Sequence, residues 1–416
     1  MSQQGSVVRY DHITGNNYSV KPTHPDPNVT LRFNWNAAIN MDPFDHSTLY
    51  FGSQFVHKST DKGLSWTIIS GDLTTNDKEK QKQGESGGLT MDATGAENHT
   101  TILVIEPSEV EQNMLWAGSD DGRVHVTKNG GSNWTDVSNN IPGLPQGSWI
   151  AQIKASNKNK GEALLIANDY RRFNYTPYAY RTKDYGASWS RIVDENDVTS
   201  YTLCILEDSE EPNLMFLGTD DGLYISIDAG NKWTKWTAGF PTVSVKDLII
   251  HPRESDLVIG TFGRAAWILD DIRPLRALAK NKEILKQKLE LFTPPTAYLA
   301  AYQQPTGSRF GADDMFNGEN RSFGSQLSYY VTIDEKKTDD KDKKKDEDED
   351  DPNCPPSPWA SSKTKQKIIA ELSDSSSDIH LLIGKYNEDN FKEVNFKKIR
   401  ENYATTSTAH PTSDQM

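Results

Sequence analysis

The chain has 416 residues, enough for two or three ordinary domains or one large all-β unit. Its 45 basic and 59 acidic residues give a net charge of −14, which disfavours nucleic-acid binding through a basic surface. No stretch reaches the roughly 18 apolar residues of a membrane span, and the start lacks the basic and apolar segments of a secretory signal. With two cysteines, Cys204 and Cys354, far apart, we expect no disulfide framework, no metal site and no cofactor.

A short pattern with fixed internal spacing occurs four times in the chain. It reads STDKGLSW at 59–66, TKNGGSNW at 127–134, TKDYGASW at 182–189 and SIDAGNKW at 226–233. An Asp or Asn oxygen at the third position accepts bonds from backbone N–H groups ahead of it, and the glycine supplies a positive φ. The tryptophan then opens the next strand and buries a large ring. We call these four segments the Asp turns.

We expect structural roles for the repeated residues of the Asp turns. The acceptors are Asp61, Asn129, Asp184 and Asp228; the glycines are Gly63, Gly131, Gly186 and Gly230; the tryptophans are Trp66, Trp134, Trp189 and Trp233. Each of the twelve has a folding task within a hairpin.

A second repeat consists of an apolar strand, a polar turn, a second apolar strand and Gly-Thr or Gly-Ser, and three of its four copies precede an Asp turn. It appears at 37–53, 102–119, 202–219 and 248–261. Together the two repeats give four strands in a unit of about 35 to 45 residues, which is typical of a β-propeller blade. Five units are expected, at 35–69, 100–137, 148–192, 200–236 and 243–271, and a remnant of an earlier unit at 5–15. The fifth unit lacks an Asp turn.

The four Asp turns resemble Asp boxes, also called bacterial neuraminidase repeats. The wider phrases resemble the sortilin-type propeller of the vacuolar sorting receptor class, in particular its bacterial relatives labelled glycosyl hydrolases. The segments that carry this resemblance are NWNAAINMDPFDHSTLYFGS, SGDLTTND, YRTKDYGASW and GTFGRAAWILDD followed by RPL. The resemblance covers residues 30–330 and implies an all-β propeller fold.

The chain departs from this family in size, because sortilin-type propellers are much larger and five blades cannot close their ring. The chain therefore looks like the C-terminal half of such a protein, a fragment that needs the missing N-terminal propeller half or another copy as its partner. Open blade edges expose unpaired strands. The resemblance implies an extracytoplasmic location, secreted, periplasmic or at the cell surface, for the intact protein.

The sequence predicts five regions in chain order. Propeller blades occupy 1–271, a helix that packs on the propeller occupies 272–292, and a loop with one strand of a C-terminal β region occupies 293–334. Residues 335–362 include a charged run without apolar residues and are expected to be a disordered insertion. Residues 363–416 are expected to contain a strand and a polar tail.

Candidate ligand residues follow from blade topology. With the strands of a blade named A to D from the inside, the B–C turns and D–A links share one face, which we call the central face, and the Asp turns lie on the opposite back face. The B–C turns of several blades carry carboxylates, guanidinium groups and aromatic rings, which suit a sugar or peptide ligand. The predicted ligand residues are Asp120, Asp169, Tyr170, Arg171, Arg172, Tyr175, Asp220 and Arg264.

Two functions of different classes remain open at this point, together with a scaffold that has no activity of its own. The first is a non-catalytic, sortilin-like propeller that binds a peptide, a protein or a carbohydrate on the central face. The second is a glycosidase that acts on O-glycosyl bonds and needs two carboxylates across a cleft. Asp120, Asp121, Asp220 and Asp221 are its candidate catalytic residues. Asp-Asp-Gly is also favourable turn chemistry without any ligand.

Overall fold

A computed structural model describes residues 5–82, 98–297 and 326–332 of the chain. It divides the chain into two compact units, Met1–Tyr330 and Val331–Met416. The predicted disordered insertion at 335–362 and the predicted strand and tail at 363–416 lie outside the described residues. Within the described ranges, no helix is long and apolar enough to cross a membrane.

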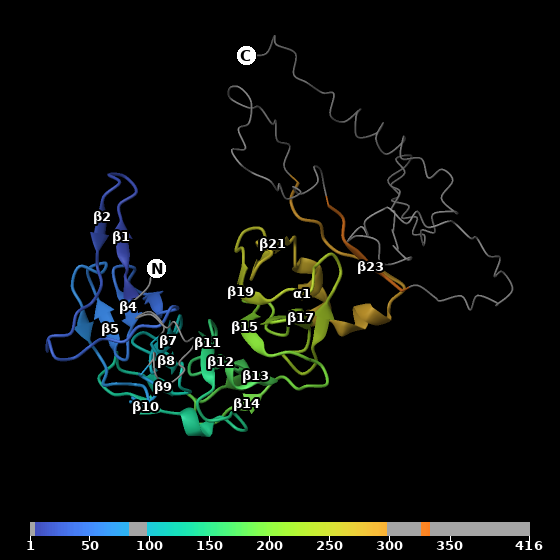
Figure 1. Cartoon of the computed structure of the whole chain (residues 1–416). Helices are drawn as coiled ribbons and strands as arrows, with labels where there is room; N and C mark the ends of the chain where they lie inside the picture. The colour runs from blue at the N-terminus through green and yellow to red at the C-terminus, as the bar shows by residue number, and fades with distance from the viewer. Residues whose placement is uncertain (1–4, 83–97, 298–325, 333–416) are drawn as a thin grey trace, which may run out of the picture. The chain divides into compact units, whose positions relative to one another are not determined.

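The first unit is built from antiparallel sheets that follow one another along the chain (Figure 1). Blade 1 comprises β3 (Ile39–Met41), β4 (Leu49–Gly52), β5 (Val56–Ser59) and β6 (Thr67–Ile68); blade 2 comprises β7 (Ile102–Pro107), β8 (Leu115–Ser119), β9 (Val124–Thr127) and β10 (Thr135–Asp136). Blade 3 comprises β11 (Trp149–Ala155), β12 (Ala163–Asp169), β13 (Asn174–Thr182) and β14 (Ser190–Arg191); blade 4 comprises β15 (Thr202–Glu207), β16 (Met215–Thr219), β17 (Gly222–Ser226) and β18 (Thr234–Trp236). Blade 5 has three strands, β19 (Val245–Ile250), β20 (Leu257–Thr261) and β21 (Ala266–Leu269). The predicted all-β propeller architecture with five blades is confirmed.

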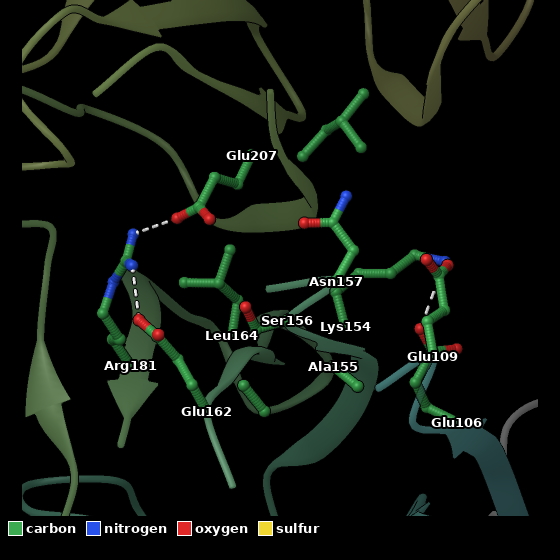
Figure 2. A pocket seen from close by; sticks show the side chains of 12 residues that line it. Glu106, Glu109, Lys154, Ala155, Ser156, Asn157, Glu162, Leu164, Arg181 and Glu207 are labelled. Carbon is green, nitrogen blue, oxygen red and sulfur yellow. Dashed lines mark hydrogen bonds and ion pairs between the residues drawn. The ribbon is translucent and has the colours of Figure 1, made fainter. Parts of the chain in front are cut away.

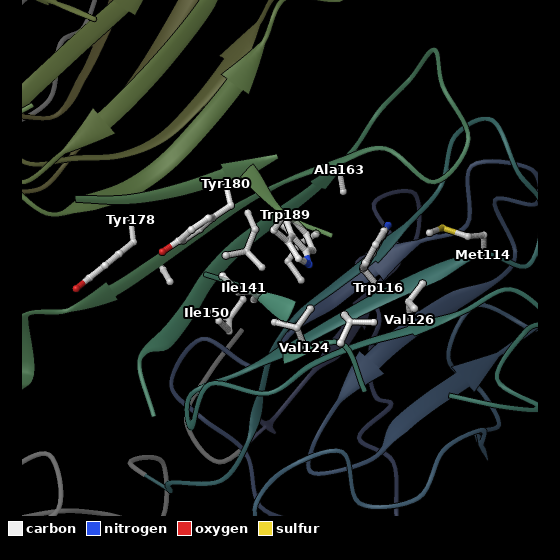
Figure 3. Close-up of a cluster of buried hydrophobic side chains, with 14 residues drawn as sticks. Met114, Trp116, Val124, Val126, Ile141, Ile150, Ala163, Tyr178, Tyr180 and Trp189 are labelled. Carbon is white, nitrogen blue, oxygen red and sulfur yellow. The ribbon is translucent and has the colours of Figure 1, made fainter. Parts of the chain in front are cut away.

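Neighbouring blades are joined by apolar cores. Figure 3 shows the core between blades 2 and 3, where the rings of Trp116 and Trp189 meet edge to face with centroids 5.8 Å apart. Glycines near the end of the second strand allow the next blade to approach closely. A Cβ on Gly118 would lie 2.6 Å from Cγ2 of Ile150 in blade 3, and a Cβ on Gly218 would lie 2.7 Å from Cγ1 of Val245 in blade 5. The close packing of these blades therefore requires glycine at this repeat position.

The four Asp turns share one hydrogen-bond pattern. In the first, Asp61 Oδ1 accepts from the backbone N–H of Ser65 at 2.9 Å, and Ser59 Oγ accepts from the backbone N–H of Gly63 at 2.8 Å. The four glycines of the turns have φ between 81° and 93°. The tryptophans of blades 1, 2 and 4 each donate their indole N–H to a backbone carbonyl of the preceding sheet, from Trp66 to Val20, from Trp134 to Ile69 and from Trp233 to Ile192.

Elements flank the blades on both sides. Before blade 1, β1 (Val8–Tyr10) and β2 (Asn17–Ser19) form a hairpin at the place of the expected remnant unit. Short 3₁₀ segments occur at Ser138–Asn140 (η2), Tyr170–Arg172 (η3) and Lys282–Lys286 (η4). After blade 5, helix α1 (Arg273–Lys280) packs against the core of blades 4 and 5 through Ala279 and through Ile272, the residue just before the helix. Beyond it, β22 (Leu289–Leu291) shares a two-stranded sheet with β23 (Tyr329–Val331).

The helix ends earlier than the sequence predicted. Apolar residues near helical spacing continue to Leu289, but the backbone of Asn281 is extended, at φ −140° and ψ 92°. The side chain of Asn281 accepts a hydrogen bond from the N–H of Glu283 and so starts the separate η4 turn. The expectation of one helix over 272–292 is therefore wrong in its second half, because an asparagine cap interrupts the apolar pattern.

A buried histidine in blade 1 makes the fold sensitive to acid. His57 is fully buried, its Nε2 lies 2.8 Å from Ser53 Oγ, and burial lowers its pKa to about 4. An unfolded histidine has a pKa of about 6.5, so below that pH the unfolded state binds a proton that the folded state does not. The free energy of unfolding therefore falls as the pH drops from 6.5 through 4.

Between pH 7 and pH 5 we expect the free energy of unfolding to fall by about 2 kcal/mol more in the unsubstituted chain than in His57→Gln. The reason is that one pKa unit corresponds to about 1.4 kcal/mol. Urea unfolding of both proteins at the two pH values measures this difference. Burial also lowers the pKa of His99 and of His125, but both remain in the variant and cancel in the comparison. Equal losses in the two proteins would contradict the prediction.

Candidate functional site

The B–C turn of blade 3 has four residues between β12 and β13, two more than that of blade 4, and lies on the central face. The turn contains η3, which is followed by Phe173. The backbone of Phe173 lies in the left-handed region at φ 61°, and the residue is 85% exposed. Asp169, at the end of β12, anchors the turn by accepting from Nε of Arg172 at 2.5 Å and from Nδ2 of Asn174 at 3.1 Å. Phe173 is therefore exposed to solvent in a turn that the hydrogen bonds of Asp169 hold in place.

Four aromatic rings and one guanidinium group form a continuous stack beside this turn. The guanidinium carbon of Arg171 lies 3.3 Å from the ring centre of Trp149 and 4.4 Å from that of Tyr170. Tyr170 stacks on Tyr201 with centroids 4.5 Å apart, and Tyr175 lies 6.1 Å from Tyr201. We call these five residues the aromatic stack. Tyr170 and Arg171 come from the B–C turn of blade 3 and Tyr175 from the start of β13, while Trp149 is the first residue of β11 and Tyr201 ends the D–A link before β15.

Polar groups surround the aromatic stack. Burial and the nearby carboxyl group of Asp220 raise the pKa of Tyr201. Asp220 is exposed in the B–C turn of blade 4. A Cβ built on Gly147 would lie 3.8 Å from both Nη1 of Arg172 and Nζ of Lys80, so two cationic groups flank this glycine. The stack therefore combines flat rings with cationic and anionic groups at its edges.

Asp120 is not part of an open surface. It is fully buried, and its carboxylate accepts from the N–H of Thr101 at 2.9 Å, from Oγ1 of Thr101 at 2.6 Å and from Nδ2 of Asn34 at 3.2 Å. Burial raises the pKa of Asp120 to about 7, against the opposite influence of its hydrogen bonds to Thr101. The carboxylate ties the B–C turn of blade 2 to the start of β7.

The second aspartate of each Asp-Asp-Gly turn is bonded within its own turn. Asp121 accepts from Oγ of Ser119 at 2.5 Å, and Asp221 accepts from Oγ1 of Thr219 at 2.7 Å. Asp121 also accepts from the backbone N–H of Thr75 at 2.7 Å, while Asp221 pairs with Lys235 at 2.8 Å. Both carboxylates therefore have a folding task, as the turn chemistry of this motif favours.

Arg264 lies apart from the aromatic stack. It is exposed in the B–C turn of blade 5, next to Phe262, which is 74% exposed, and Lys246 lies 5.8 Å from the Phe262 ring centre. Within the described residues, no ring contact or hydrogen bond joins Arg264 to the stack. Of the predicted ligand residues, Tyr170, Arg171 and Tyr175 belong to the aromatic stack, and its other two members, Trp149 and Tyr201, were not among the predicted residues.

A pocket of about 150 Å³ lies on the back face, where the sequence predicted no site (Figure 2). Arg181 lines this pocket and forms two ion pairs, from Nη1 to Oε1 of Glu162 at 2.8 Å and from Nη2 to Oε2 of Glu207 at 2.6 Å. Nζ of Lys154 lies 3.7 Å from Oε1 of Glu106. Burial raises the pKa of Glu106 and of Glu207. Because Arg181 and Lys154 pair with glutamates of blades 2, 3 and 4, we regard this pocket as part of the blade interfaces. In the described part of the chain, no cluster of His, Cys, Asp and Glu side chains is arranged to hold a metal ion.

Comparison with known proteins gives one family match. Residues 178–272 match the family model described as Sortilin, neurotensin receptor 3. No curated protein matches the sequence. Similar solved structures include the GH74 xyloglucanase from Xanthomonas campestris, at 16% identity and TM-score 0.43, covering 56% of this chain and 36% of that one.

Two further structures share the likeness at low identity. YCF48 from Cyanidioschyzon merolae has 13% identity and TM-score 0.36, covering 59% of this chain and 68% of that one. The β-propeller domain of Cps50 from Myceliophteria thermophila has 11% identity and TM-score 0.38, covering 58% and 67%. The chain spans about a third of the length of the xyloglucanase that it matches. The resemblance to the sortilin-type propeller, found in the sequence phrases, is thus confirmed by the family match over residues 178–272.

Proposed function

We propose that this propeller is a non-catalytic binding module that takes a peptide, protein or glycan ligand on its central face. The observation that carries the proposal is the aromatic stack, with Arg171 held between the rings of Trp149 and Tyr170. Aromatic rings accept the apolar faces of sugars or side chains, and the exposed cations beside them make directional bonds to carboxylate or carbonyl groups. Phe173 extends this surface into solvent.

The charges on the central face favour a ligand with acidic groups. Arg171, Arg172 and Lys80 lie around the stack and Gly147, although the chain as a whole carries a net charge of −14. On a protein with a net negative charge, a local group of cations attracts an acidic ligand to that place, while the rest of the surface repels it. A peptide with acidic and aromatic side chains, or a glycan with a carboxylate, fits this arrangement.

The four candidate catalytic aspartates support the alternative function, a glycosidase, less well than the aromatic stack supports binding. That chemistry needs two carboxyl groups that both reach the substrate. Asp120 has the raised pKa of a general acid, but it is fully buried, and Asp121 is buried beside it. Asp221 is engaged by Lys235, which leaves Asp220 as the exposed member of the predicted set. We therefore base the proposal on binding.

We further propose that the intact protein works outside the cytoplasm, in keeping with the sortilin match of residues 178–272. Expression of a tagged full-length protein in its host, followed by fractionation, tests this location. Recovery of the tagged protein in the cytoplasmic fraction would contradict it.

We expect Arg171→Ala to lower the affinity for the ligand at least tenfold, because the side chain holds two rings of the stack and offers its N–H groups to the ligand. Arrays of immobilised peptides and glycans identify a bound probe, and titration of that probe against both proteins measures the change. Lys128→Ala is the matched control, since Lys128 lies 4.8 Å from the ring centre of Tyr185 in an Asp turn on the back face. Equal losses in the two variants would place the ligand elsewhere.

A further inference from the structure

Exposed aromatic rings occur on two blades of the central face. Phe173 and Tyr175 of blade 3 are 85% and 55% exposed, and Phe262, in the B–C turn of blade 5, is 74% exposed. Exposed apolar groups that gather on one face of a protein are typical of a binding surface. The apolar part of the central face therefore extends beyond the aromatic stack to blade 5.

A cation lies beside the rings on each of these two blades. In blade 3 the guanidinium carbon of Arg171 lies 4.4 Å from the ring centre of Tyr170. In blade 5 Nζ of Lys246, near the start of β19, lies 5.8 Å from the ring centre of Phe262. Both cations are exposed, and in the described part of the chain no carboxylate forms an ion pair with either of them. The combination of a cation and an aromatic ring therefore occurs twice.

Lys246 connects the two places. Burial lowers the pKa of Lys246, the carboxylate of Asp220 opposes this shift, and the guanidinium group of Arg171 adds to it. Lys246 is therefore close to Arg171 of the aromatic stack as well as to Phe262. The two combinations of cation and ring belong to one surface, which we call the cationic strip and define by Arg171, Tyr175, Lys246 and Phe262.

We propose that the ligand of the central face is an acidic polysaccharide whose uronic acid units contact both the aromatic stack and the blade 5 turn. This inference rests on the proposed binding function and names the ligand class. A uronic acid carries its carboxylate on the same rigid ring that offers an apolar face, so one unit meets one cation and one aromatic ring. A chain of such units repeats this combination, as the cationic strip does.

A peptide fits the cationic strip less well. Its acidic and apolar groups are on separate flexible side chains, and each of them loses rotamer freedom when it is held at the surface. An extended peptide gains affinity from backbone pairing with the edge of a strand. Arg171 and Phe262 lie in turns, so the strip offers no strand edge at these two positions.

The test measures the binding of two fluorescein-labelled decamers to the full chain. One is an oligogalacturonate, and the other is the same sugar chain with its carboxylates converted to methyl esters, which keeps the rings and removes the charges. We expect the acid to bind at least tenfold more tightly than the ester at low salt. This preference is expected to shrink as the salt concentration rises, because salt screens exposed charges.

Two variants separate the contribution of the charge from that of the ring. Lys246→Gln is expected to weaken binding of the acid at least fivefold and to leave binding of the ester unchanged, whereas Phe262→Ala weakens binding of both. Lys128→Gln is the matched control, because it removes the same charge beside a ring, Tyr185, on the back face. Lys246 and Phe262 are exposed, so their substitution leaves no gap in a core.

Equal binding of the acid and the ester, or equal effects of Lys246→Gln and Lys128→Gln, would overturn this proposal. Tighter binding of a decapeptide of alternating glutamate and tyrosine than of the acid would also overturn it, and would identify a peptide as the ligand. In each of these cases the proposed binding function stands as long as Arg171→Ala weakens binding of the probe. Failure of the binding function itself gives a different result, in which no probe binds in a way that Arg171→Ala changes.

Discussion

Gly218→Ala is expected to destabilise the chain by about 3 kcal/mol, near the upper end of the cost of overpacking a core. The added Cβ would lie 2.7 Å from Cγ1 and 2.9 Å from the carbonyl oxygen of Val245, and it would also overlap Sγ of Cys204. A backbone oxygen cannot rotate away, so blades 4 and 5 would have to separate to accept the methyl group. Urea or thermal unfolding measures the loss.

The control for this substitution is Gly260→Ala, at the same repeat position in blade 5. There the nearest atoms to the added Cβ are Cβ and the carbonyl oxygen of Asp247 in the same blade, both 3.6 Å away at ordinary van der Waals distance. We expect a change of less than about 0.5 kcal/mol, as is usual for a substitution that meets no neighbour. Equal effects at the two glycines would show that the blades do not stack as described.

Much of the fold could be predicted from the sequence because most blades repeat the same short local motif, the Asp turn. The glycine and the Asp or Asn acceptor of an Asp turn act within eight residues, so their spacing shows directly in the sequence. The end of helix α1 could not be predicted in this way. Ile284 and Leu289 continue a helical spacing, but Asn281 caps a new turn, and Leu289 enters β22.

The candidate site was predictable only in part, for a related physical reason. Tyr170 and Arg171 lie in one turn and Tyr175 follows at the start of β13, so their unusual composition marks this segment in the sequence. Trp149 joins them from the start of β11 and Tyr201 from the link before β15, and only the packing of blade 4 on blade 3 brings Tyr201 over Tyr170. Burial of Asp120 likewise depends on Thr101 and Asn34, which are distant in sequence.

Arg276→Ala is expected to cost about 3 to 5 kcal/mol, the usual loss when one partner of a buried ion pair is removed. Arg276 lies on α1 and holds Oδ2 of Asp208 through Nε at 2.9 Å and Nη2 at 2.8 Å. It also holds Oγ of Ser255 at 3.0 Å and Glu210 at 2.8 Å. Asp208 is fully buried, so the variant would leave a carboxylate without its cation inside the protein.

The same helix supplies the control. Arg273 pairs with Asp271 nearer the surface, with 36% of its side chain exposed, and we expect Arg273→Ala to cost less than about 1 kcal/mol. The double variant Arg276→Ala, Asp208→Asn is expected to recover part of the loss, because the uncompensated charge is gone. Urea unfolding of these variants and of the single variant Asp208→Asn measures this coupling. Equal losses for the two arginines, or additive losses in the double variant, would mean that this ion pair does not fasten α1 to blades 4 and 5.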